Sequence, residues 1–190
     1  MAKLGQIASI RMGYPFRSRL VHHAKGSIAV VQMKDIDEAN LLHVENAARV
    51  ELGDVKEHHL LRVGDLVFKS RGSNNKLALV SMDVGPAVLA APMLLVRPVE
   101  VLPAYLLWYI NLPATQAALA KQAMGTSVQM ISKAVLEDLD VPLPARQKQA
   151  LIVEAARLAD TEQKLMERHT RARKRLADAM LMRYAKDTRR

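Results

Sequence analysis

The last quarter of the chain contains a long segment, residues 146–184, without a single proline or glycine. Apolar residues recur in it at alternating steps of four and three, which is the heptad spacing of a helix that buries one face against another helix. The apolar positions are Leu151, Ala155, Leu158, Leu165, Ala172, Leu176 and Ala179, and the polar Glu162 and His169 occupy the same seam. The segment therefore predicts a coiled-coil helix with a partner, and the two polar residues are candidates for fixing its register.

The length of this helix also constrains the fold. At about 1.5 Å per residue, residues 146–184 extend over roughly 58 Å. A compact domain built from the preceding residues has a radius of gyration of only about 15 Å. We therefore expect the helix to extend beyond its own domain and the chain to work within an assembly.

The positive charge is concentrated in the same region. The net charge is +9, but residues 1–145 contribute 15 Lys and Arg against 13 Asp and Glu, whereas residues 146–190 contribute 13 against 6. The C-terminal segment thus carries +7, which favours a polyanion such as nucleic acid as partner. Near its far end, Arg171, Arg173, Lys174 and Arg175 are explained equally well by a solvated helix face or by direct contact with DNA.

Composition excludes several classes of protein. The chain has no cysteine, so it has neither a disulfide framework nor a cysteine-bearing metal or redox site. No run of 18 apolar residues is present, and the first residues do not form a signal peptide. We expect a cytoplasmic protein that does not interact with membranes.

The first part of the chain is rich in short predicted strands, and its later part in helices. Apolar runs predict strands at residues 27–33, 66–71, 77–82, 88–91 and 93–97. Proline at the first helical position predicts helices from Pro103 and from Pro113 or Ala114, and Ser132 is expected to cap a helix over 133–139. The extended segment Val141–Pro144 separates these elements from the long helix. We therefore predict an α+β fold, with a β-rich domain at 1–143 and a long coiled-coil helix at 144–190.

Two polar loops are candidates for contact with a nucleic acid. In the first, Lys69 and Arg71 are two residues apart and point to one side of a predicted strand, and three loop residues with short polar side chains follow. Arginine pairs with guanine and asparagine with adenine. The candidates in this loop are Lys69, Arg71, Ser73, Asn74 and Asn75. A β-hairpin with a solvated edge explains the same pattern equally well.

The second polar loop leads into the predicted helix that follows Ser132. Backbone amides at a helix N-terminus bind anions, so a phosphate contact is one interpretation, and an ordinary helix cap is the other. The candidates in this loop are Ser127, Gln129 and Lys133.

No pattern in the sequence favours catalysis. The pairs His22–His23 and His58–His59 lack the spacing and the accompanying carboxylates of a metal site, and are better explained as structural or surface residues. Asp35, Asp37 and Glu38 are the nearest approach to a nuclease site, although an exposed acidic turn is the favoured interpretation. We predict no catalytic residue, no metal and no cofactor.

Several motifs occur in an order that is similar to a known family. Val141–Pro144 followed by Gln149, Ile152 and a long amphipathic helix is the most specific of them. The others are Leu4–Ala8 with Gly13, Gly64–Val67 followed by basic residues and Gly72, Leu102–Pro103 with Tyr105 and Leu106, and Gly125–Ser127 leading through Ile131 to Leu136. Over nearly its whole length the chain resembles the specificity (S) subunit of type I restriction–modification systems. It departs from the family at Lys148, where a glutamate commonly precedes the family's glutamine.

The resemblance implies a function that the residues alone do not specify. Family members usually carry two target-recognition domains and two long helices, so this chain looks like a half-length form. The resemblance implies a non-catalytic subunit that reads one half of a split site in double-stranded DNA. The helix would pair antiparallel with a second copy and dock methyltransferase (M) subunits, and through them the restriction (R) subunit. The alternatives are a coiled-coil scaffold protein that does not bind DNA and a stand-alone nuclease.

Overall fold

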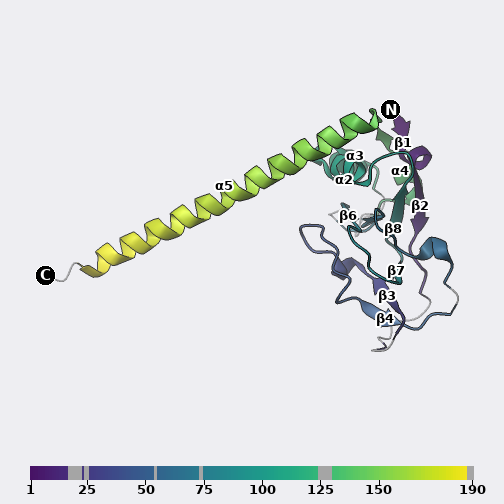
Figure 1. Cartoon of the computed structure of the whole chain (residues 1–190), viewed down its shortest axis with the longest axis horizontal. Helices are drawn as coiled ribbons and strands as arrows, with labels where there is room; N and C mark the ends of the chain where they lie inside the picture. The colour runs from purple at the N-terminus through teal and green to yellow at the C-terminus, as the bar shows by residue number, and fades with distance from the viewer. Residues whose placement is uncertain (17–22, 24–25, 54, 73–74, 124–129, 188–190) are drawn as a thin grey trace. The chain divides into compact units, whose positions relative to one another are not determined.

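The protein consists of two compact units in its computed structural model (Figure 1). The structure describes residues 1–16, 23, 26–53, 55–72, 75–123 and 130–187. Unit 1 is Met1–Ala150, and unit 2 is Leu151–Arg190. The predicted boundary at 143/144 lies just before the long helix, which starts at Arg146, whereas the division after Ala150 places the first turn of that helix in unit 1.

A four-stranded antiparallel sheet forms the centre of unit 1. Its strand order is β2–β8–β5–β6. The strands are β2 (Ala8–Met12), β8 (Leu94–Pro98), β5 (Leu66–Phe68) and β6 (Leu77–Leu79). Every residue of β5 is buried, because this strand lies between two others and is covered on both faces. An uninterrupted apolar run is typical of such a strand.

A second sheet has three strands in the order β4–β3–β7. They are β4 (Ala48–Val50), β3 (Ile28–Val31) and β7 (Ala87–Leu89). The β3–β7 pair is parallel, and the β3–β4 pair is antiparallel. Short 3₁₀ helices precede and follow β4, at Met33–Asp35 (η1) and Glu57–His59 (η2).

Gly13 allows the end of β2 to approach the second sheet closely. Its N–H donates to the carbonyl of Met93 at 2.9 Å. A Cβ atom at this position would lie 2.6 Å from the backbone of Leu89 and Ala90, a distance that real contacts do not allow. Only glycine therefore fits here, which gives a physical reason for its place among the motifs.

Helices cover the remaining part of unit 1. They are α1 (Leu4–Ile7), α2 (Pro103–Asn111), α3 (Pro113–Lys121) and α4 (Lys133–Glu137). The predicted proline starts of α2 and α3 agree with the structure. Ser132 caps α4 as expected, since its hydroxyl oxygen accepts a hydrogen bond from the Val135 N–H at 3.2 Å.

The segment before the long helix is anchored on both sides. Its first residues form β9 (Asp140–Val141), which pairs with β1 (Ala2–Lys3). The Tyr105 hydroxyl donates to the Pro142 carbonyl, and the Tyr109 hydroxyl to the Asp140 carbonyl, both at 2.9 Å. The prolines leave the carbonyls of this extended segment without helical partners, and these side chains satisfy two of them.

Gln149 connects the first turn of the long helix to the rest of unit 1. Its side-chain oxygen accepts from the Leu102 N–H at 2.9 Å, and its side-chain nitrogen donates to the Pro144 carbonyl at 2.8 Å. The residue is 1% exposed. Glutamine supplies both the acceptor and the donor that this position requires. Lys148, the departure from the family motif, is exposed beside it.

The long helix α5 (Arg146–Asp187) is continuous, as the absence of proline and glycine predicts (Figure 1). Its 42 residues make it by far the longest element of the described chain. None of the helices in the described part of the chain has the length and apolarity that crossing a bilayer requires. The observed architecture is the predicted one, a mixed α and β domain followed by a long C-terminal helix.

Candidate nucleic-acid interface

The two loops that the sequence singles out lie side by side. Arg71 forms an antiparallel bridge with Met130, and the Ile131 N–H donates to the Ser70 carbonyl at 2.9 Å. About sixty residues separate the two segments along the chain. We call residues 69–72, 75–76 and 130–133 the two-loop surface; Ser73, Asn74, Ser127 and Gln129 lie outside the described residues.

Two of the candidate residues in the first loop are buried. Lys69 is 8% exposed and Asn75 is 6% exposed. The Asn75 side-chain amide donates to the Lys69 carbonyl at 2.8 Å and so closes the loop. Burial lowers the pKa of Lys69, and the neighbouring Lys76 lowers it further. Asn75 thus holds the backbone of the loop in place, and contact of either side chain with DNA stays a prediction.

Among the candidates of the first loop that the structure describes, Arg71 is the exposed one. It follows Ser70, whose hydroxyl donates to the Pro92 carbonyl at 2.6 Å and fixes the chain at this point. Gly72, next to it, has a φ of +95°, which glycine adopts without strain. The guanidinium of Arg71 is therefore presented from a well-anchored backbone.

Lys133 lies at the start of α4, on an open groove of about 530 Å³. It forms an ion pair with Glu137 at 3.4 Å, one turn further along the helix. Ser9 and Arg11 of the edge strand β2 line the same groove. Arg11 is exposed, and it adds a second positive charge that the sequence did not single out, because only the fold brings β2 next to α4.

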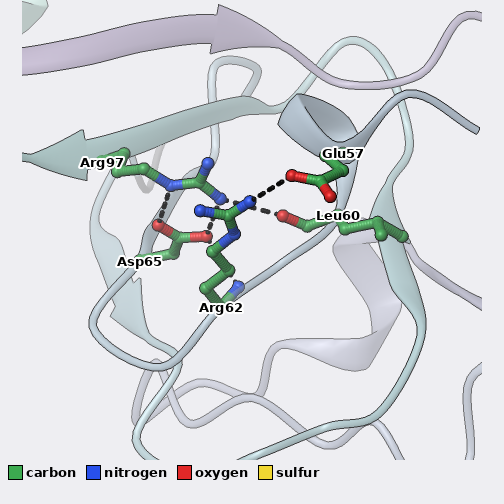
Figure 2. Close-up of polar contacts among 5 residues, drawn as sticks. All are labelled: Glu57, Leu60, Arg62, Asp65 and Arg97. Carbon is green, nitrogen blue, oxygen red and sulfur yellow. Dashed lines mark hydrogen bonds and ion pairs between the residues drawn. The ribbon is translucent and has the colours of Figure 1, made fainter.

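The turn that leads into β5 is held by a buried charge pair (Figure 2). Asp65 is 1% exposed, and both of its oxygens accept from the guanidinium of Arg97 at 2.7 Å. One of them also accepts from the Arg62 N–H at 2.8 Å. The second nitrogen of Arg97 donates to the Leu60 carbonyl at 2.9 Å. Asp65 raises the pKa of Arg97, and this network fixes the start of the strand that carries the first loop.

Two of the three carboxylates of the nuclease alternative, Asp35 and Asp37, make hydrogen bonds within their own loops. Asp35 is buried, and its side chain accepts from the Gln32 N–H at 2.8 Å. Asp37 accepts from the Leu41 N–H at 2.8 Å and from His43 at 3.0 Å. The hydrogen bond with His43 lowers the pKa of Asp37 and raises that of His43. Each of these two carboxylates thus fixes a turn of its own loop.

The histidine pairs do not form part of a metal-binding cluster within the described chain. The rings of His58 and His59 have their centres 4.4 Å apart and are tilted by 45° to each other, and burial lowers the pKa of His59. Among the described residues, no group of three or more histidine, aspartate and glutamate side chains is arranged so that it could hold a metal ion. His22 lies outside them.

The predicted seam of α5 is exposed in the single chain. Leu151, Leu158, Leu165 and Leu176 are between 54% and 71% exposed. The other predicted seam residues are exposed as well: Ala155, Glu162, His169, Ala172 and Ala179. Exposed leucines at heptad spacing are typical of a face that a partner covers.

Comparison with solved structures identifies the fold. The HsdS subunit of Thermoanaerobacter tengcongensis matches with a TM-score of 0.61 at 19% identity, over 86% of this chain and 37% of that chain. A chain from a study of complex assembly and conformational transition of the type I restriction–modification system matches with a TM-score of 0.72 at 20% identity, over 95% and 44%. The S subunit of a type I system from M. genitalium matches with a TM-score of 0.55 at 13% identity, over 84% and 38%.

No family model and no curated protein matches the sequence. The chain spans less than half the length of the three solved chains. The structural likeness nevertheless extends over nearly all of this chain, including the long helix. The protein therefore has the fold of type I restriction–modification S subunits.

Proposed function

We propose that this chain is a half-length specificity subunit, which recognises one half of a bipartite DNA target for a type I restriction–modification system. The observation that carries the proposal is the extent of the structural match. One match covers 95% of this chain but only 44% of the solved chain. Such coverage fits one recognition domain with one long helix, where the family usually has two of each.

The two-loop surface reads the target in this proposal. Its support is the bridge between Arg71 and Met130, which joins the two polar loops into one surface. Arg71 is the candidate for a base contact, because its guanidinium is exposed and can pair bidentately with guanine. Lys133 and Arg11 are suited to phosphate contacts, which supply affinity without reading sequence.

The seam of α5 pairs with the same face of a second copy. A two-fold symmetric dimer reads a two-fold symmetric site, because the symmetry of the protein imposes itself on the DNA. Methyltransferase subunits dock along the paired helices and recruit the restriction subunit. The chain itself supplies no catalytic group, and it acts in the cytoplasm. A coiled-coil scaffold that does not bind DNA is the alternative.

Co-expression with candidate methyltransferase subunits, followed by sequencing of methylated genomic DNA, tests the proposal. The expected result is methylation at a bipartite, two-fold symmetric sequence that depends on this chain. Arg71→Gln should abolish this methylation or change its sequence, whereas Arg62→Gln, an exposed arginine away from the two-loop surface, should leave it unchanged. Co-purification without any duplex binding at physiological salt would instead support the scaffold.

A further inference from the structure

The edge strand β6 leaves two backbone groups of Leu77 facing away from its neighbour β5. Leu77 lies opposite Phe68, whereas the hydrogen bond between the two chain segments runs beside this pair, from the Lys69 N–H to the Lys76 carbonyl. In an antiparallel pair this alternation turns the N–H and C=O of every second residue outward. Outward groups on an edge strand attract the strand of another chain unless the fold covers them.

The side chain of Asn111, the last residue of α2, covers this edge. Its oxygen accepts from the Leu77 N–H at 2.8 Å, and its nitrogen donates to the Leu77 carbonyl at 3.0 Å. A primary amide contains both an acceptor and a donor, so it offers what the peptide groups of a further strand would offer. Asn111 thereby fixes the chain at the point where the first loop returns to the sheet.

Gln116 holds the same loop two residues earlier. It is the fourth residue of α3, which starts at Pro113. Its side-chain nitrogen donates to the Asn75 carbonyl at 3.1 Å and to the Ile110 carbonyl at 2.8 Å, so one amide joins the end of α2 to the loop. The side chain of Asn75 in turn donates to the Lys69 carbonyl at 2.8 Å.

These contacts form a continuous path to the residue that is proposed to read a base. We call Asn111 and Gln116 the amide clamp. The clamp fixes the limb of the first loop that returns to the sheet, and Asn75 passes this constraint to Lys69, two residues before Arg71. Neither clamp residue belongs to the two-loop surface, and both are half-buried.

We propose that the amide clamp determines how selectively the chain reads its DNA target, because it holds the loop of Arg71 in one position. This inference rests on the function proposed above. A guanidinium recognises guanine through two hydrogen bonds, and both must be aligned to exclude the other bases. Strand pairing does not depend on the clamp, since β6 pairs with β5 over three residue pairs. Asn111 and Gln116 are thus positioning residues, which act without touching DNA.

The test uses the complex of the full chain with its methyltransferase subunits. Gln116→Leu removes both hydrogen bonds that Gln116 donates and keeps a side chain of similar size. Leu119→Val is the matched control, because it removes one buried methylene from the same helix and no hydrogen bond. Methylation rates are compared between the target duplex and duplexes with one base pair changed in the half-site.

The ratio of these rates should fall about tenfold in Gln116→Leu, since a good bidentate base contact contributes about 5- to 150-fold of discrimination. Asn111→Leu should show a similar fall and serves as the second variant. Leu119→Val should keep the ratio of the unaltered complex. The slope of log affinity against log salt on a random duplex should be the same for all variants, because no phosphate contact is lost.

Amide hydrogen exchange of the full chain tests the clamp without DNA. Asn111→Leu leaves the Leu77 N–H without its acceptor, so this amide should exchange at least about tenfold faster than in Leu119→Val. Equal exchange in the two variants would overturn the clamp. An unchanged ratio in Gln116→Leu, or an equal fall in Leu119→Val, would overturn its role in selectivity and leave the proposed function intact. If the unaltered complex methylates no defined sequence, the proposed function fails, and the role in selectivity fails with it.

Discussion

Two neighbouring ion pairs at η2 and the turn before β5 differ in what they should contribute to stability (Figure 2). Asp65→Asn removes the charge of a buried carboxylate and leaves Arg97 without its ionic partner. Breaking a buried pair from one side typically costs 3–5 kcal/mol, and we expect about 3 kcal/mol here because the Arg97 side chain is 25% exposed. Urea unfolding followed by the fluorescence of Trp108, the only tryptophan, measures the loss in unit 1.

Glu57→Gln is the matched control for Asp65→Asn. It breaks the exposed pair between Glu57 and Arg62, whose atoms are 3.2 Å apart. Such pairs are worth about 0.5 kcal/mol, so the free energy of unfolding should barely change. Equal losses in the two variants would show that the buried pair has no special role.

A second prediction concerns Gln149. Gln149→Ala removes both the acceptor for the Leu102 N–H and the donor for the Pro144 carbonyl. Leaving such groups without partners costs about 1–3 kcal/mol, so we expect unit 1 to lose about 2 kcal/mol in urea unfolding. Gln147→Ala, at an exposed position two residues earlier, should have no measurable effect. A loss of equal size at Gln147 would contradict the role assigned to Gln149.

Sequence and structure differ most clearly at Lys69. Side-chain alternation predicts that Lys69 and Arg71 share a face, but alternation gives exposure only where one face of a strand is open to solvent. β5 is covered on both faces, and the residues directly after it, Lys69 and Ser70, are still buried. The chain reaches the surface only at Arg71, which is exposed. The ion pair of Asp65 could not be predicted from the sequence either, since its partner Arg97 is 32 residues away along the chain. Gln149 could be singled out from a motif, but its two hydrogen bonds require the fold.

At the scale of elements, local signals explain what could be predicted. Helix α5 could be predicted from the periodicity of its apolar residues and from the absence of proline and glycine. The predicted range 146–184 ends three residues before the observed end at Asp187. The predicted strands 66–71 and 77–82 are each three residues too long, because the residue types do not show that the strand pairing ends at Phe68 and at Leu79. Strand β4 was missed, since only its pairing with β3 distinguishes Ala48–Val50 from a loop.

A third prediction concerns the seam of α5. Leu158→Asp together with Leu165→Asp places two charges in the proposed helix–helix contact, and the dimer should become a monomer. Light scattering coupled to size exclusion gives the mass of each form. Gln163→Asp with Thr170→Asp is the control, because these residues are also seven apart but lie off the seam. An identical mass for both double variants and the unaltered protein would remove the seam as the pairing face.

At the scale of the whole molecule, the sequence identified the parts of the proposed interface but not their arrangement. Each polar loop could be found from its residue types, yet neither loop alone indicated that Arg71 and Met130 are neighbours. The contribution of Arg11 depends on the packing of β2 against α4 in the same way. The seam differs from the loops and from Arg11, because a heptad pattern within a single helix already indicates that this face packs against a partner helix.

The last prediction treats paired helices as a spacer between two recognition domains. Duplicating Ala159–Leu165 directly after Leu165 adds one heptad to α5 and preserves the seam. In an antiparallel pair this lengthens the overlap by about 10.5 Å, so the gap between the two half-sites should grow by about three base pairs. Sequencing of methylated DNA from cells that co-express the methyltransferase measures the gap. Inserting two alanines at the same place rotates the seam by about 200° and should abolish methylation. Methylation with an unchanged gap after the heptad insertion would show that the helix does not set the distance.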